Sequence, residues 1–463
     1  MLLSFTYVTK AQVGVNILIP DSSAAFQIES SDRGFLPPRM NNNQRDAISS
    51  PASGLTIYNT QDSVLEYYNG ACWLPVYARE CGECDYNIFL SPSTATIDRT
   101  TTDTVFTTLQ VTRTAGDDPV NLVILSSLPP GIFAQLDTTI IDSVGSASLM
   151  VGASIFAPAG DYPIIIQSVC DTRTQFSVFT VTVEPCIQIS IGSNASDYDL
   201  MALNALPGPG FPVCVVVDVD AGVTLNSSNP TTPAFNTGVL DVQSHVGIRN
   251  SGNIIGRGGD GGVGGGFSSI PPGDPGKAGG NAVNLTCRTE IQNNGRIYGG
   301  GSGGGSVGIG FTVNIPIVGS FTFSIGAGGG GGCENGAGGN TTISIPLFAA
   351  GSSAGSGPFA QPGQGGVLST TLNIPLGIAS INITPSGTGG DGGDFGQQGS
   401  AGNIGINVSA QIPFIGNISL LNQSANGPAS QAPGNAIKRN NNNLIGIGDG
   451  FYNSSSVKGN VGN

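Results

Sequence analysis

Glycine tracts interrupted by apolar residues constrain this chain more than any other feature of its sequence. The stretch from Asn250 to Gly266 is NSGNIIGRGGDGGVGGG, and the stretch from Gln292 to Ser306 repeats the pattern as QNNGRIYGGGSGGGS. Ordering a glycine costs more backbone entropy than ordering any other residue, so a folded tract needs a compensating gain. A flexible linker explains the glycines but gives no reason for the repeated apolar residues.

Two interpretations of these tracts compete. Disordered linkers would place serine and charge among the glycines, whereas isoleucine, valine, phenylalanine and asparagine interrupt them here. Alternatively, glycine strands of the polyproline II type pack side by side, and hydrogen bonds between the strands offset the entropy cost. We expect the ordered packing. Collagen itself is excluded because no strict G-X-Y period is present.

The composition of the chain changes along its length. The chain has 463 residues, enough for two or three domains, and only ten of its 72 glycines precede residue 190. Charged residues make up 10%, and the formal net charge is −14, which argues against binding to a phosphate backbone. No apolar run approaches the length of a membrane helix. We therefore expect an architectural boundary near residue 190.

Residues 1–80 form an N-terminal arm and a small module. For the start, MLLSFTYVTKAQ, an extended arm is preferred over a cleaved secretory signal. NNNQRDAIS predicts one or two helical turns, and GLTIYNT with LEYYNGACW predicts a β-hairpin. The module has too little apolar mass to stand alone, so we expect it to lean on a neighbouring chain.

Residues 85–187 contain short runs rich in Val, Ile, Thr and Phe, separated by turn signals such as AGDD, LPPG and APAGD. Six or seven strands without helical periodicity predict a β-sandwich. The LPPG turn and the strand GDYPIII resemble bacterial immunoglobulin-like repeats, which implies a spacer.

Residues 188–463 form the glycine-rich repeat domain. The repeated unit is SGNIIGRGG at 251–259 and NGRIYGGGS at 294–302, with NNLIGIGDG at 442–450 as a looser third version. Short β-like runs alternate with the glycine tracts, and some share the step I-P-[IL]. We expect apolar rungs that alternate with packed glycine.

Two parts of the chain resemble known families. The string RGFLPPRM with QRDAI, IYNT and YYNG, at roughly residues 11–77, resembles a module near the N-termini of secreted surface proteins and phage fibres of the Bacteroidota. The stretch from VDAGVTL to NGRIYGGGSGGG, at roughly 213–306, resembles the glycine-rich receptor-binding regions of phage tail fibres and adhesins.

These resemblances imply an elongated, all-β spike or fibre on the virion surface, which attaches the phage to its host without enzymatic activity. The N-terminal module would join other virion structural proteins, and the glycine-rich part would contact a host glycan or protein receptor. A homotrimer follows by analogy with such fibres. A secreted Bacteroidota adhesin and a polysaccharide-degrading spike are the two rival functions.

Aromatic residues beside the glycine tracts are the candidate receptor contacts. Exposed rings on rigid loops suit stacking on sugars or contact with a protein, and the alternative is that they fill gaps between chains of an oligomer. The candidates are Phe267, Tyr298, Phe359, Phe395, Phe451 and Tyr452.

The sequence gives little support for catalysis or metal binding. GSSAG at 351–355 fits the nucleophile elbow G-x-S-x-G by chance, because the chain has one histidine and no strand-to-helix context there. No cofactor or metal is expected, and Asp260, Asp391 and Asp394 are only weak calcium candidates because the calcium nonapeptide period is missing. The eight cysteines favour disulfides or buried thiols over a zinc site at CGEC.

Overall fold

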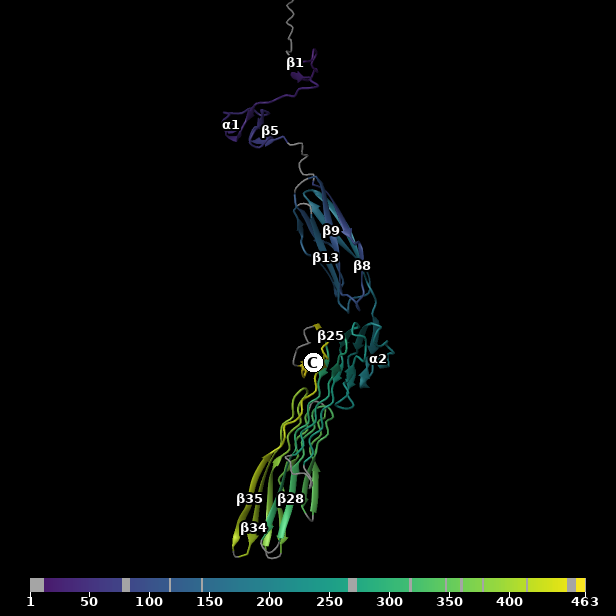
Figure 1. The fold of residues 1–463 in the computed structure, drawn as a ribbon, viewed down its shortest axis with the longest axis vertical. Coiled ribbons are helices and arrows are strands. Elements are labelled where there is room, and N and C mark those ends of the chain that lie inside the picture. The colour runs from purple at the N-terminus through teal and green to yellow at the C-terminus, as the bar shows by residue number, and fades with distance from the viewer. Residues whose placement is uncertain are drawn as a thin grey trace, which may run out of the picture. The chain divides into compact units, whose positions relative to one another are not determined.

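The computed structural model describes residues 12–76, 84–115, 118–142, 145–264, 273–315, 319–345, 348–358, 361–376, 379–413, 415–447 and 455–462. Strands make up 47% of the structure and helices 2%, which confirms the predicted all-β class. The chain divides into two compact units (Figure 1), one of Met1–Asn87 with Arg113–Pro119 and Val169–Thr174, and one of the remaining residues. In the described part, no helix is long and apolar enough to cross a membrane.

The N-terminal strands form two small sheets. Strands β1 (Val13–Val15) and β2 (Phe26–Ile28) pair in parallel. The second sheet has the order β3 (Arg39–Met40), β4 (Thr56–Asn59), β5 (Val64–Tyr68) and β6 (Trp73–Pro75). Strands β4 and β5 are the predicted hairpin, and the predicted helical turn is α1 (Asn42–Asp46), which begins with a capping box of Asn41 and Gln44.

Polar contacts hold this small module together. Arg45 Nη1 lies 2.9 Å from Glu66 Oε2, and the fully buried Asn59 donates a 3.0 Å hydrogen bond to Glu66. By contrast, Leu18 is 96% exposed and Ile19 is 80% exposed. The part of the N-terminal region between β1 and β2 therefore leaves apolar side chains uncovered, in line with the low apolar content of this region.

Residues 85–183 form two sheets, each with one buried face. The four-stranded sheet has the order β11 (Ile132–Leu136), β13 (Gly145–Ala153), β9 (Thr104–Ala115) and β7 (Asp85–Ser91). The five-stranded sheet has the order β12 (Ile140–Ile141), β10 (Val120–Ile124), β14 (Gly160–Cys170), β15 (Arg173–Val183) and β8 (Thr94–Ile97).

Alternate residues of these strands are buried, as in a β-sandwich. The run NIFLSPSTATI is not a single strand, because Pro92 separates β7 from β8, which joins the other sheet. A disulfide links Cys84 to Cys170, and a second links Cys186 to Cys214. An immunoglobulin-like topology stays a prediction.

Three five-stranded parallel sheets follow, and we call them the coil because the chain visits the sheets in turn. The first sheet contains β16 (Ile187–Ile191), β19 (Cys214–Val219), β22 (His245–Asn250), β25 (Arg288–Asn293) and β37 (Leu444–Ile447). The second contains β17 (Ala195–Ser196), β20 (Thr224–Asn226), β23 (Asn253–Ile255), β26 (Arg296–Tyr298) and β38 (Val457–Lys458). The third contains β18 (Tyr198–Asp199), β21 (Phe235–Asn236), β24 (Val283–Asn284), β36 (Ile437–Lys438) and β39 (Val461–Gly462). A short helix, α2 (Leu200–Leu203), follows β18.

Aliphatic side chains stack from one turn of the coil to the next. In the second sheet Leu225, Ile254, Ile297 and Val457 are aligned on successive strands, and the first three are fully buried. The repeats SGNIIGRGG and NGRIYGGGS are thus neighbouring rungs. The expectation that NNLIGIGDG is a third copy of this unit is wrong: its strand β37 pairs with β25 in the first sheet, and the next rung after Ile297 comes from β38.

The glycine tracts leave the coil and pack on one another through their backbones; we call them the glycine bundle. They occupy mainly 256–264, 273–280, 299–306, 328–339, 354–358, 361–366, 389–402 and 427–434. Amides of Gly256, Gly259 and Gly262 donate to carbonyls of Tyr298, Gly301 and Gly304 at 2.8–2.9 Å. Amides of Gly258, Gly261 and Gly264 donate to a different tract, at Glu334, Ala337 and Asn340. This spacing of three residues is the repeat of a polyproline II helix.

Side chains have no room inside this bundle. A Cβ placed on Gly330 would lie 1.9 Å from the carbonyl oxygen of Gly363, and one on Gly304 would lie 2.0 Å from that of Gly390. Glycine is therefore required by the close approach of neighbouring backbones. The linker interpretation does not fit these contacts.

Candidate functional site

Two antiparallel sheets extend from the glycine bundle, and we call them the hairpin sheets. The first contains β27 (Val307–Ile315), β28 (Gly319–Ala327), β29 (Asn340–Ile345) and β30 (Phe348–Ser353). The second contains β31 (Val367–Leu368), β32 (Leu372–Leu376), β33 (Ala379–Thr388), β34 (Asn403–Ile412) and β35 (Gly416–Asn426).

The register of these strands places four hairpin turns at one end. The strands β27, β28, β33 and β34 meet the glycine bundle at Val307, Ala327, Thr388 and Asn403. At the other end of the sheets the last paired residues are Ile315 with Gly319, Ile345 with Phe348, Leu376 with Ala379 and Ile412 with Gly416, and we call this end, as far as these residues, the turn end (Figure 1). Each first strand of these hairpins ends in or just before an Ile-Pro step, at Ile315, Ile345, Ile374 and Ile412. The turn end is therefore the part of the hairpin sheets farthest along the strands from the bundle.

An apolar core lies between the two hairpin sheets. Phe311 and Phe323 stack with ring centroids 5.2 Å apart, and they belong to the same buried cluster as Ile381, Ile383 and Val408 of the facing sheet. Such a packed core fixes strand register, because a slip of one residue would turn the buried side chains outward. The hairpins are thus a rigid support for the turn end.

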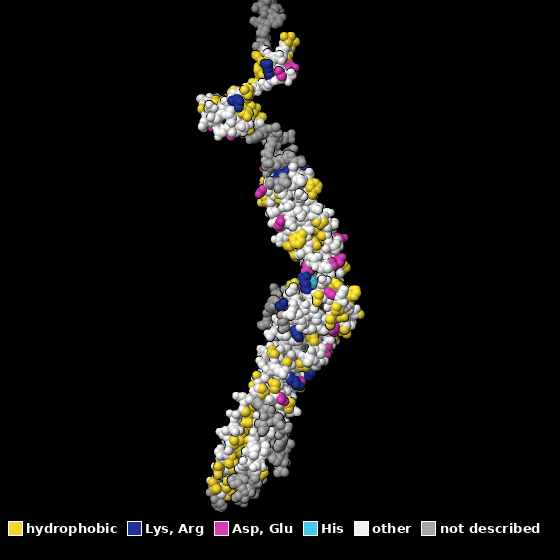
Figure 2. Space-filling view, viewed as in Figure 1, with side chains coloured by type: hydrophobic (Ala, Val, Ile, Leu, Met, Phe, Trp, Pro, Cys, Tyr) yellow, Lys and Arg dark blue, Asp and Glu magenta, His cyan; other side chains and the backbone are white. Residues whose placement is uncertain are grey.

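The hairpin sheets contain no charged residue in their strands. Between Val307 and Asn426 the only charged residues are Glu334, Asp391 and Asp394, and all three lie in glycine-tract segments. Figure 2 accordingly shows hydrophobic and uncharged polar side chains over the described part of this end on the face in view. The strands at this end therefore offer no charged side chain for an ion pair.

Apolar side chains are exposed beside the turn of β34 and β35. Ile415 is 68% exposed, Leu420 is 40% and Ile418 is 38%. The strand β35 lies at the edge of its sheet, and its register shifts between Val408 and Ser409, which is a β-bulge. A free sheet edge with exposed apolar side chains is a typical surface for binding another molecule.

The structure corrects the prediction for two of the aromatic candidates. Tyr298 is 7% exposed and Phe395 is 3% exposed, and their rings lie 5.0 Å apart in a buried cluster with Ile255 and Cys333. They fill a gap where the glycine bundle meets the coil, so neither offers a ring face to a receptor. Phe267, Phe359, Phe451 and Tyr452 lie outside the described residues.

The three aspartate candidates for calcium have other partners. Asp260 lies 3.4 Å from Lys277 Nζ and accepts a hydrogen bond from Ala337 N, and Asp391 accepts one from Gly365 N. Asp394 lies 3.6 Å from Lys458 Nζ. Among the described residues no group of three or more His, Cys, Asp or Glu side chains could hold a metal ion. These carboxylates brace the glycine bundle instead.

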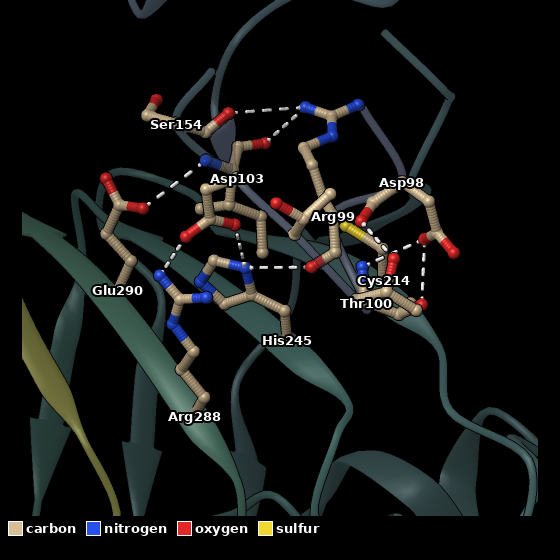
Figure 3. Close-up of polar contacts among 12 residues, drawn as sticks. Asp98, Arg99, Thr100, Asp103, Ser154, Cys214, His245, Arg288 and Glu290 are labelled. Carbon is tan, nitrogen blue, oxygen red and sulfur yellow. Dashed lines mark hydrogen bonds and ion pairs between the residues drawn. The ribbon is translucent and has the colours of Figure 1, made fainter. Parts of the chain in front are cut away.

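A second polar cluster lies where the sandwich meets the coil within the second unit (Figure 3). Arg288 of β25 pairs with Asp103, and the Nδ1 atom of His245 lies 3.2 Å from the carbonyl oxygen of Arg99. Burial and, to a smaller extent, the Arg288 charge lower the pKa of His245 to about 4, although the Asp103 charge opposes them. Burial raises the pKa of Glu290, which accepts a hydrogen bond from Ile155 N.

This cluster does not have the arrangement of a catalytic site. His245 is 1% exposed and lies in the first coil sheet, whereas the serine of the GSSAG stretch, Ser353, ends strand β30 of the hairpin sheets. Sequence reasoning missed the cluster because its members are far apart in the chain. The only indication of this cluster in the sequence was the single histidine in a chain with few charged residues.

Of the remaining cysteines in the described part, Cys287 and Cys333 are buried free thiols and Cys72 is exposed. Burial raises the pKa of Cys287 and of Cys333 to about 12, so both stay protonated and unreactive. The expectation of disulfides or buried thiols therefore holds for Cys287 and Cys333 and for the four cysteines in disulfides, but is wrong for Cys72.

Comparisons with known proteins identify the family. A solved structure of a protein of unknown function from Porphyromonas gingivalis W83 shares 10% identity, covers 73% of this chain and 98% of its own, and has a TM-score of 0.17. The comparison with curated proteins gives no match. Residues 14–98 match the family described as phage tail like trimerisation region, which supports a homotrimer. Residues 186–459, more than half of the chain, match the family described as phage tail fibre adhesin Gp38. The chain therefore belongs to the phage tail fibre adhesin Gp38 family.

Proposed function

We propose that this protein attaches the phage to its host through the turn end of the hairpin sheets, without catalysing a reaction. The family supports a virion-surface fibre for host attachment. The observation in favour of the turn end is its combination of a rigid core, exposed apolar side chains and an absence of charge. The N-terminal region would hold three copies together and join them to the particle.

The lack of charge narrows the class of receptor. A phosphate-rich surface would call for Lys or Arg side chains, and the strands of the hairpin sheets have none. A neutral glycan or an uncharged protein surface fits the exposed isoleucine and leucine side chains better. Binding should therefore depend little on ionic strength.

Competition with phage adsorption tests the proposal. The purified full chain should block adsorption, and the double variant Ile418→Asp and Leu420→Asp should block it about tenfold less well, because apolar contacts at the centre of an interface supply most of its energy. Val239→Asp is the matched control, since Val239 is 67% exposed but lies between β21 and β22 of the coil.

Two results would count against this function. One is a double variant that competes as well as the unmodified chain. The other is release of oligosaccharides from host capsule or lipopolysaccharide by the purified protein, which would favour the polysaccharide-degrading rival.

The salt dependence tests the class of receptor separately. A change of affinity larger than about twofold between low and high salt would contradict recognition without ion pairs.

A further inference from the structure

The outer face of the four-stranded sandwich sheet presents aromatic rings to solvent. Phe89 of β7 is 59% exposed, Phe106 of β9 is 58% and Phe133 of β11 is 49%. The residues beside them on each strand are buried or half-buried, so the rings lie on the side opposite the core. A domain that acted only as a spacer would have no need of three such rings.

One of these rings reaches over the neighbouring strand. Phe133 is aligned with Gly152 of the neighbouring strand β13, and a Cβ on Gly152 would lie 2.2 Å from Phe133 Cζ. The tip of the ring therefore lies over the Gly152 backbone, while 49% of the side chain stays exposed. In the adjacent row Met150 lies between Phe106 and Gln135. Two phenylalanine rings and a thioether thus share one exposed face of the sheet with uncharged polar side chains such as Gln135 and Ser148.

A cavity of about 540 Å³ opens at the edge of the sandwich beside this surface. It lies between β11 of one sheet and β10 with β12 of the other, and Gln135, Asn121 and Thr139 are its polar lining residues. None of its lining residues is charged. The volume lies in the range of pockets that bind small molecules or single sugar units.

We propose that this face and cavity form a binding site for a neutral polysaccharide, separate from the turn end of the hairpin sheets. Sugar rings present C–H groups that stack on aromatic faces, and their hydroxyl groups hydrogen-bond to side-chain amides and hydroxyls. The absence of charge in the cavity lining matches an uncharged sugar. The sandwich would thus hold the fibre on surface glycan while the turn end finds its receptor.

A second copy of the chain fits this face less well. The match to the trimerisation region ends at residue 98, so β9, β11 and β13 lie beyond it. The face also alternates rings with Thr108, Ser148 and Gln135, whereas permanent subunit interfaces are more continuously apolar.

Affinity electrophoresis of the full chain tests the proposal, with galactomannan, glucomannan, xyloglucan and dextran as probes cast in native gels. At least one of them should retard the unmodified chain, and Phe133→Ala and Phe106→Ala should each bind about tenfold more weakly. Phe133→Trp should bind as well as the unmodified chain. Phe176→Ala is the control, because Phe176 is 62% exposed on β15 of the other sheet.

Gly152→Ala provides a second variant, because its Cβ would lift the Phe133 ring while leaving all three phenylalanines in the chain. It too should lose retardation, with an unchanged melting temperature. Retardation of the unmodified chain by none of the four polysaccharides would overturn the proposal, as would equal retardation of Phe133→Ala. A lower mass of Phe133→Ala in light scattering would show a subunit contact and would also overturn it.

Discussion

The coil and the glycine bundle reach order by opposite means, although they are consecutive parts of the same chain. In the coil, aliphatic side chains such as Ile254 and Ile297 stack in a buried interior, and the strands pair with neighbours in their own sheet. In the bundle the buried side chains are few, such as Cys333 and Phe395, and the tracts contact one another mainly through backbones whose amides donate to more than one neighbour at a spacing of three residues. The side-chain core of the coil can accept another apolar residue of similar volume, whereas the packed backbones of the bundle accept no added side chain.

The coil and the glycine bundle make different demands on the amino-acid sequence. A coil position needs only an apolar residue of suitable volume, whereas a bundle position such as Gly330 needs the absence of a side chain. Glycine loses more entropy on folding than any other residue, so the bundle must recover that cost through hydrogen bonds and close packing.

Gly330→Ala should have the largest effect, with a loss in the free energy of unfolding above about 4 kcal/mol. The new Cβ would lie 1.9 Å from the Gly363 oxygen, and neither backbone can move without breaking hydrogen bonds to the next tract. Chemical unfolding followed by hydrogen exchange measures it. Gly462→Ala is the control, because a Cβ there meets no atom within 4 Å. Equal stability of the two variants would contradict backbone packing.

Ile297→Ala should destabilise the coil by about 3 kcal/mol, because it removes a fully buried side chain between Ile254 and Val457. The glycine bundle should keep its protection in the same sample. Hydrogen exchange resolved by peptide separates the two regions. If amides of the bundle lost their protection against exchange before amides of the coil did, the two regions would not be stabilised independently.

Acid should weaken the coil through its histidine. The pKa of His245 falls from its ordinary value of 6.5 to about 4 on folding, so the unfolded chain binds the proton more readily between these values. The free energy of unfolding therefore has its full value above pH 6.5 and falls by on the order of 3 kcal/mol as the pH drops toward 4. Burial of Glu290, which raises the pKa of its carboxyl, opposes part of this loss.

The chain has a single histidine, so the NMR titration of its imidazole C–H signals reports this site alone. An apparent pKa near 6.5 in the folded protein would contradict the burial of His245. His245→Gln should make the melting temperature less dependent on pH over the same range.

Lys458→Met should have the smallest effect, about 1 kcal/mol. Its Nζ atom lies 5.3 Å from the ring centroid of Tyr298 and 5.7 Å from that of Phe395, and it is 3.6 Å from Asp394. Thermal unfolding measures the loss. A change above about 3 kcal/mol would mean that this side chain, and not the glycine backbones, holds the bundle to the coil.

The sequence predicted the rungs and the all-β class, because Ile254 and Ile297 recur within near-identical stretches. It did not reveal the three parallel sheets, because long glycine insertions after Ile255 and Tyr298 hide the period. It misjudged Tyr298 and Phe395, since glycine neighbours usually indicate an exposed loop, whereas this bundle excludes water around them. It also gave no sign that Asp103, Arg288 and His245 meet, because such contacts depend on the fold.

Amide hydrogen exchange in the tracts Gly258–Gly264 and Gly328–Gly332 tests the central claim most directly. Our account predicts exchange slowed about 100-fold or more relative to an unstructured peptide, with the strongest protection at amides that donate to a neighbouring tract, such as Gly259, Gly262 and Gly330. Exchange as fast as in the unstructured peptide would mean that the tracts are linkers, and the backbone-packed glycine bundle would have to be abandoned.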